Sequence, residues 1–212
     1  MKQLAWVFFV LCGMTIPTFS APQYRAGESS TMISSLLHGE VSAAYLLSSQ
    51  KMETKEEDLD TSALKGWDVR ALWAPLTWLS VGAEMTKFGD EKMKQAFVSS
   101  YETNRIAGIV KFTLSPNTSP RVYALVGYGR TEHQLNYDHT TNPIATRKWP
   151  GSEKKNIPYW MAGLGVEVNV WKVVFVGVEG NILRHQTTDL PRYYKTDSKT
   201  ETALRARLGV RF

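Results

Sequence analysis

The stretch "ALRARLGVRF" (203–212) decides the fold, because its residues alternate between two chemically distinct faces. Successive side chains of a β-strand point to opposite sides. One face of this strand is apolar: Leu204, Ala206, Leu208, Val210 and Phe212. The other face carries three arginines: Arg205, Arg207 and Arg211. Such a strand requires two different environments, and the rest of the chain indicates which they are.

The same period of two recurs along the chain and predicts seven further strands. They cover residues 40–48, 67–73, 79–87, 105–114, 121–129, 159–170 and 173–182. In 121–129 both faces are apolar or glycine, so the alternation leaves the phase of that strand open. Together with 203–212 these segments predict an all-β chain of eight strands.

The connections between these strands alternate between short and long. The short ones contain "APLT" (74–77), "SPNTSP" (115–120) and "WK" (171–172), whereas the long ones cover 49–66, 88–104, 130–157 and 183–200. This alternation is typical of an eight-stranded antiparallel up-and-down transmembrane β-barrel with tight periplasmic turns. Aromatic residues near both sets of connections favour the same fold: Trp73, Trp78, Trp171 and Phe212 near the short ones, and Trp67, Tyr128, Tyr159 and Trp160 near the long ones. The alternative, a secreted sandwich or lipocalin-like barrel, would bury the charged faces.

The N-terminal residues resemble a secretory signal peptide. Lys2 precedes the apolar run "LAWVFFVLCGM", and small residues lead to a cleavage site after Ser20. We therefore expect three parts: a signal peptide (1–20), a periplasmic N-terminal segment (21–38) and the barrel domain (39–212). The formal net charge of +5 is a mild excess, which favours no nucleic-acid partner.

The charged faces of the predicted strands point into a narrow lumen, where buried charges persist only when they are paired. We expect a salt-bridge network there, with Arg205 and Arg207 near Glu179 and Glu40. Its expected members are Asp68, Arg70, Glu84, Lys111, Glu167, Glu179, Arg205 and Arg207. The favoured interpretation is a polar plug. The alternative is an ion or proton path, as in a narrow porin-like channel.

At this point the chain resembles the small eight-stranded outer-membrane barrels: OmpA transmembrane domains, OmpX/Ail proteins and opacity-like surface proteins. The resemblance rests on the signal peptide, the alternating strands, "YALVGYG" (123–129) and the terminal "LGVRF" (208–212). It implies an integral outer-membrane protein of a Gram-negative bacterium, with no cofactor and a structural or adhesive role. Leu208, Val210 and Phe212 resemble the signal that is read by the barrel-assembly machinery.

Two chemical alternatives concern histidines. The spacing of His185 and Thr187 resembles the catalytic pair of a PagL-like lipid A deacylase, although a threonine stands in place of the serine. The alternative is a solvated loop at the top of the strand. His133 and His139 flank Asp138 and suggest a metal site, but histidines in loops are usually surface residues. We therefore expect no catalytic residue and no metal.

The third long connection contains a basic segment, "ATRKWPGSEKKN" (145–156). Its basic and aromatic side chains are candidates for ligand binding: Arg147, Lys148, Trp149, Lys154 and Lys155. They suit lipopolysaccharide phosphates, or a glycan or protein on a host surface, through attraction that salt screens. An ordinary solvated loop is the alternative.

Overall fold

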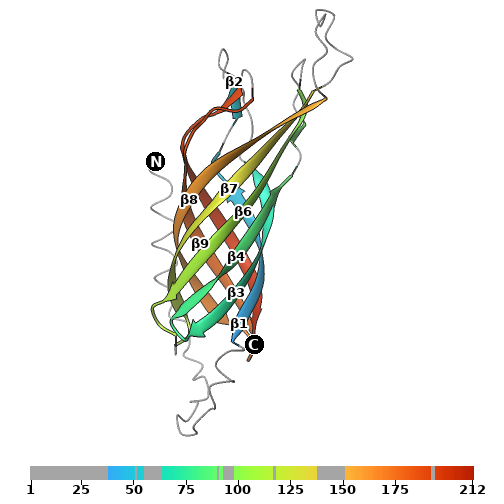
Figure 1. Ribbon diagram of the computed structural model, residues 1–212. Coiled ribbons are helices and arrows are strands. Elements are labelled where there is room, and N and C mark those ends of the chain that lie inside the picture. The colour runs from blue at the N-terminus through green and yellow to red at the C-terminus, as the bar shows by residue number, and fades with distance from the viewer. Residues whose placement is uncertain are drawn as a thin grey trace, which may run out of the picture.

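The computed structural model describes residues 38–50, 52–54, 64–89, 91–92, 98–116, 118–137, 151–191 and 194–212. Eight long strands of this part of the chain close into an antiparallel barrel, as the sequence predicts (Figure 1). They are β1 (Gly39–Ser48), β3 (Lys65–Leu76), β4 (Leu79–Phe88), β6 (Val98–Thr113), β7 (Arg121–Tyr137), β8 (Ser152–Asn169), β9 (Val174–His185) and β11 (Thr200–Arg211). Three short strands accompany them: β2 (Met52–Thr54), β5 (Glu91–Lys92) and β10 (Tyr194–Thr196). Among these residues no helix is long and apolar enough to cross a membrane.

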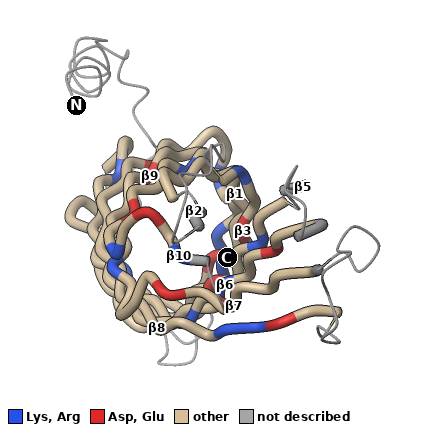
Figure 2. Tube along the Cα trace, turned by 90° about the horizontal axis from the view of Figure 1, so that it is seen from above, with Lys and Arg blue, Asp and Glu red and all other residues tan. Residues whose placement is uncertain are grey.

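The first and last long strands close the sheet. β1 pairs with β3 on one side and with β11 on the other, from Glu40 opposite Arg211 to Ser48 opposite Ala203. Gly39 and Phe212 exchange two backbone hydrogen bonds of 2.8 and 3.0 Å at the end of this seam. Figure 2 shows the resulting ring of strands. Closure satisfies the backbone groups within the sheet, which a hydrocarbon environment requires.

The two ends of the barrel differ. The described residues of the short turns, 77–78, 114–116, 118–120 and 170–173, lie at the same end as the C-terminus (Figure 1). The strand ends that lead into the long connections lie at the other end, where β2 pairs with β10. Figures 1 and 2 together place this small two-stranded sheet over the mouth of the barrel.

Three neighbouring strands are longer than the sequence predicts. β6 begins at Val98, β7 continues to Tyr137 and β8 begins at Ser152, so parts of the expected connections 88–104 and 130–157 are strand. They form an outer projection that runs on past the rest of the barrel (Figure 1). Both faces of these extensions are rich in polar residues, so the apolar period that marks a strand ends before the strand does.

The outer surface carries large exposed apolar side chains over its middle and two bands of aromatic residues. The outer band, towards the long connections, contains Tyr45, Trp67, Tyr128 and Trp160. The inner band, at the short turns, contains Trp73, Trp78, Trp171 and Phe212. Tyr159, which the sequence also suggested for the outer band, instead points inwards and is only 1% exposed. Paired aromatic bands mark the two interfaces of a membrane.

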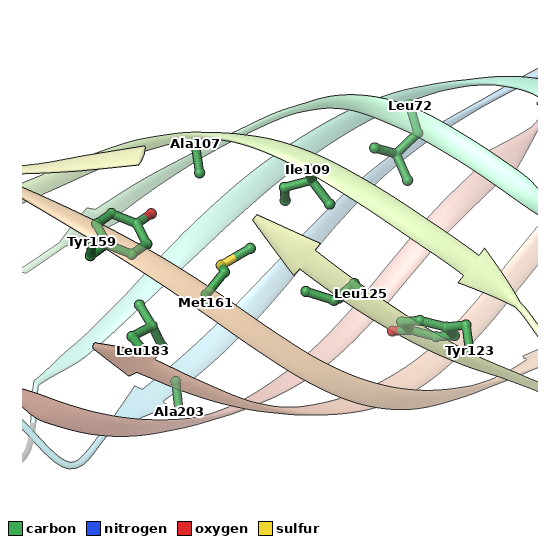
Figure 3. Packing of buried hydrophobic residues seen from close by; sticks show 9 residues of the cluster. All are labelled: Leu72, Ala107, Ile109, Tyr123, Leu125, Tyr159, Met161, Leu183 and Ala203. Carbon is green, nitrogen blue, oxygen red and sulfur yellow. The ribbon is translucent and has the colours of Figure 1, made fainter. Parts of the chain in front are cut away.

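The lumen has an apolar side, formed mainly by β6, β7 and β8 (Figure 3). Tyr123 and Leu125 point into it, and Val126 and Tyr128 point outwards, which fixes the phase of the strand at 121–129. Glycines leave room for its large side chains. A Cβ atom on Gly165 would lie 2.3 Å from the Tyr123 hydroxyl. The strand was ambiguous in sequence because its inward face is apolar as well.

Candidate functional site: a charged lumen

The middle of the lumen is organised around Arg70 of β3. Its Nε and Nη2 donate to Glu84 Oε2 of β4, at 2.9 and 2.6 Å. Its Nη1 and Nη2 donate to the two carboxylate oxygens of Glu179 on β9, at 2.7 and 2.8 Å. All three side chains are buried. Arg70 therefore bonds a carboxylate on its own side of the barrel and another across the lumen.

Two arginines of β11 complete this central layer. Arg205 Nη1 lies 2.7 Å from Glu84 Oε2 and 3.2 Å from Glu179 Oε1. Arg207 Nη1 lies 2.9 Å from Asp68 Oδ1 and donates to the Ser42 hydroxyl at 3.0 Å. The layer thus contains three arginines and three carboxylates. The equal numbers matter, because an unpaired charge in this position would be strongly destabilising.

A second layer lies towards the short turns. Lys111 of β6 bridges Glu40 of β1 and Glu167 of β8, at 2.9 and 2.6 Å. Arg211 also forms an ion pair with Glu167 and donates to Asn169 Oδ1 at 2.8 Å. Glu40, expected beside Arg205 and Arg207, lies here instead. Its position opposite Arg211 in the register puts it at the turn end of β1.

A third layer lies towards the long connections and involves residues that the sequence analysis missed. Arg105 of β6 donates to both oxygens of Glu201 on β11, at 2.7 and 2.6 Å. Gln50 accepts a further bond from Arg105 at 3.1 Å. Arg105 lies on the same inward face of β6 as Lys111, because residues an even number of positions apart on a strand point the same way. Glu201 likewise shares the inward face of β11 with Arg205. Arg105 begins the predicted strand 105–114, and Glu201 lies two residues before the predicted strand 203–212, so applying the alternation to the strand ends would have found both.

The two residues considered for a deacylase have different partners. His185 is buried in the lumen, where its Nε2 lies 3.1 Å from Glu201 Oε2. Thr187 donates its hydroxyl to Asp189 at 3.2 Å. His185 therefore does not belong to a solvated loop, and it does not face the acyl chains of a lipid. His185 lies six residues after Glu179 on β9, an even number, so both side chains point into the lumen.

His133 was expected at the surface but is buried in the lumen of the outer projection, beyond Tyr128 of the outer band. The Tyr101 hydroxyl and His133 Nδ1 are 2.6 Å apart. Burial, assisted by the positive charge of Arg105, lowers the pKa of His133 to about 3. Asp138 and His139 lie outside the described residues. Within the part of the chain that is described, no three His, Cys, Asp or Glu side chains form a group that could hold a metal ion.

The basic segment of the third connection is only partly described. Lys154 and Lys155 belong to β8 rather than to a loop. Lys154 is exposed and its Nζ lies 3.0 Å from Glu132 Oε1 of β7. Lys155 is half-buried. The other three candidates of this segment lie outside the described residues: Arg147, Lys148 and Trp149.

The residues that resemble an assembly signal lie on the outer surface of β11 and beyond it. Leu208 and Val210 point outwards, in line with the other apolar residues of that strand. Phe212 is exposed at the inner aromatic band. The three side chains therefore form one outward-facing row that ends at the turn side of the barrel.

A closed sheet with an apolar outer surface, two aromatic bands and a polar interior defines a membrane-spanning β-barrel. The family model for the outer membrane protein beta-barrel domain matches residues 15–212, and the chain belongs to this family. This is therefore an outer-membrane β-barrel protein. The comparison with curated proteins finds no matching sequence.

Among the solved structures that share the fold are Ail and OprG. Ail, the attachment invasion locus protein of Yersinia pestis, is 12% identical with a TM-score of 0.52; the match covers 82% of this chain and 98% of that one. The outer membrane protein OprG from Pseudomonas aeruginosa is 6% identical with a TM-score of 0.55, covering 82% and 95%. At these identities the similarity concerns the fold alone.

Proposed function

We propose that this protein is a non-conducting structural and surface-interaction protein of the Gram-negative outer membrane. The observation that supports this most strongly is the charged lumen. Ion pairs cross it at three levels: Arg105 with Glu201, Arg70 with Glu179 and Lys111 with Glu40. Mixed charges that neutralise one another at each level favour a plug over an ion path. Interaction would then take place at the outer surface, in an adhesin-like manner.

The outer projection is the part of the barrel that suits such an interaction. It extends beyond the outer aromatic band, and Lys154 and Lys155 lie on it. Arg147, Lys148 and Trp149 precede them in the same connection. These basic and aromatic residues would attract an anionic glycan or an acidic protein surface of a host cell.

Export and assembly follow the same proposal. Residues 1–20 would act as the signal peptide, 21–38 would lie in the periplasm and 39–212 would form the membrane domain. The outward row of Leu208, Val210 and Phe212 would be recognised by the barrel-assembly machinery. Replacing Phe212 by alanine should lower the amount of assembled barrel in the outer membrane, measured by the mobility shift between unheated and heated samples.

Conductance tests the plug. Purified protein added to planar bilayers should give no steady unit conductance, while a general porin in the same chamber serves as the positive control. Reproducible single-channel steps from this protein would contradict the proposal. They would favour the narrow channel instead.

Cell binding tests the surface role. Replacing Arg147, Lys148, Lys154 and Lys155 by glutamine should weaken attachment to cells or to heparin-coated surfaces at low salt. The control is Lys172→Gln, at a short turn of the opposite end. Unchanged binding by the fourfold variant would overturn this part of the proposal.

We also propose that the protein is not an enzyme, because His185 is bonded to Glu201 inside the lumen. A deacylase assay on lipopolysaccharide, with His185→Ala as the comparison, should show no difference between the two proteins. Release of a fatty acid that depends on His185 would refute this.

A further inference from the structure

The outer wall of the barrel carries a shallow, open groove of about 310 Å³ at the level of the outer aromatic band. It is lined by Ile106, Gly108, Tyr128, Arg130 and Pro158, together with the neighbouring residues Ala107 and Gly129. Gly108 points outwards, and a Cβ atom there would meet nothing closer than the Tyr128 carbonyl oxygen at 4.0 Å. The groove is therefore an apolar indentation in the surface that faces lipid, and it has room for part of an acyl chain.

Two arginines lie on this wall: Arg130 lines the groove, whereas Arg184 lies outside its lining, on the far side of β8. Arg130 follows Tyr128 on the outward face of β7, and Arg184 of β9 lies directly opposite Trp160 of β8. Both are exposed, and neither forms an ion pair with any residue that the structure describes. Lys154, higher on the same wall, is by contrast paired with Glu132. The groove thus adjoins one cation, Arg130, and a second, Arg184, lies one strand beyond β8 at the level of the outer aromatic band.

Above the arginines the wall becomes a surface of amides, hydroxyls and carboxylates. Asn136 donates to the Ser100 hydroxyl at 2.9 Å, and Gln134 donates to Asn136 at 3.0 Å. Asn104 and Glu132 are opposite each other in the register, between this surface and Arg130. Side chains of these types hydrogen-bond to sugar hydroxyls. From the membrane outwards, the wall therefore presents an apolar groove, then positive charge, then a hydrogen-bonding surface.

We propose that this wall binds one phosphorylated glycolipid of the outer leaflet. An acyl chain occupies the groove, a phosphate lies between Arg130 and Arg184, and the sugars contact the polar surface of the outer projection. Guanidinium groups bind phosphate oxygens in a bidentate manner, which favours a defined position over general attraction. The site relies on the membrane position of the fold but not on the adhesive role or on the plugged lumen.

The test uses the purified full barrel in detergent, with lipid A or phosphatidylglycerol added and bound lipid counted by native mass spectrometry. We expect Arg130→Gln with Arg184→Gln to weaken lipid A binding about tenfold, as the loss of charge-assisted bonds predicts. The matched control is Lys65→Gln with Lys87→Gln, two exposed bases on β3 and β4. That pair should bind lipid A within about twofold of the unchanged protein, because its effect is limited to weak surface electrostatics.

A second pair of variants tests the groove. Gly108→Leu should fill it and weaken lipid A binding, whereas Gly180→Leu should not. Gly180 is also an exposed glycine and has nothing within 4 Å of its Cβ position, so both substitutions leave the barrel intact. The mobility shift on heating checks that each variant folds. If the variant with both arginines replaced does not fold, the single variant Arg184→Gln is tested in its place.

Three outcomes would overturn the proposal. They are equal losses from the arginine and lysine pairs, retention of phosphatidylglycerol as strongly as lipid A, and unchanged binding after loss of both arginines. If Gly108→Leu and Gly180→Leu changed lipid A binding equally, the groove would not be part of the binding site.

Discussion

The guanidinium of Arg70 on β3 bonds both carboxylate oxygens of Glu179 on β9, two strands that β1 and β11 separate in the sheet. The bond joins residues 109 positions apart in sequence. A link of this kind holds two walls of the barrel at a fixed distance. It also puts an ion pair in the middle of the lumen, where its energetic contribution can be measured.

Glu179→Gln should lower the free energy of unfolding by about 3–5 kcal/mol, because it leaves buried arginines without a matching charge. Urea unfolding from lipid vesicles, followed by tryptophan fluorescence, measures the change. The control is Glu132→Gln, which breaks the exposed pair with Lys154 and should cost at most about 1 kcal/mol. Adding Arg70→Met to Glu179→Gln restores charge balance and should recover part of the loss. Similar effects of the buried and exposed substitutions would contradict the account of the lumen.

The free-energy cost of placing a charge on the lipid-facing surface should depend on how deep the residue lies in the membrane. Val178 of β9 points outwards between Val166 and Ala206 of the neighbouring strands. Val178→Arg should therefore cost about 2–4 kcal/mol, the value for a base near the middle of the bilayer. Thr202→Arg, near the outer rim, should cost about 0–1 kcal/mol in the same unfolding assay. Equal stability of the two variants would contradict the placement of Val178 near the middle of the bilayer and Thr202 near its outer rim.

Gly209 should tolerate no side chain without adjustment of its neighbours. A Cβ atom there would lie 2.4 Å from the Phe175 ring and 2.6 Å from Ser42 Cβ. Gly209→Ala should cost about 1–3 kcal/mol by overpacking. Gly180→Ala, with open space at its Cβ, should stay within about 0.5 kcal/mol.

The contact between Gly209 and Phe175 allows the cause of this loss to be tested. Combining Gly209→Ala with Phe175→Leu should cost less than the sum of the two single changes, because the smaller side chain leaves room for the new methyl group. Strict additivity would mean that the Phe175 ring is not what excludes a side chain at Gly209.

His133 predicts a dependence of stability on pH. Its pKa is about 3 in the folded protein and about 6.5 in an unfolded chain, so between these values only the unfolded state binds the proton. Stability should therefore be complete above pH 6.5 and fall by about 1 kcal/mol per pH unit below it, down to about pH 3. Unfolding at several pH values, compared with His133→Gln, isolates this contribution. Parallel pH profiles of the two proteins would contradict this, because they would show that folding does not change the pKa of His133.

Periodicity alone predicted much of this fold, and the reason is visible on β11. Arg205 and Leu204 must face different environments, and a slip of one residue would exchange them, so the alternation determines which face points inwards. Periodicity could not predict the partners. Whether Arg205 contacts Glu84 or Glu40 depends on the stagger of strands around the barrel, which no single strand encodes. Glu40 was therefore expected in the wrong layer.

The apolar pattern also could not predict where the strands begin and end. The alternation reports contact with lipid, and it fades where Thr103 and His133 continue β6 and β7 past the membrane. Their burial depends on a lumen that extends above the outer aromatic band. Arg105 and Glu201 lie in the same region of the lumen, at or beyond the ends of the apolar segments. Their ion pair was therefore missed, although the alternation along each strand does place both side chains on the inward face.

The seam between β1 and β11 has a consequence for how the barrel forms. The contacts that close the sheet, from Glu40 opposite Arg211 onwards, join the two ends of the domain and are the most non-local in the molecule. Until they form, both edge strands would expose unpaired backbone groups to hydrocarbon, at several kcal/mol each. A partly inserted sheet is consequently a high-energy species. Insertion and closure should proceed together, with a slow and cooperative transition instead of strand-by-strand growth.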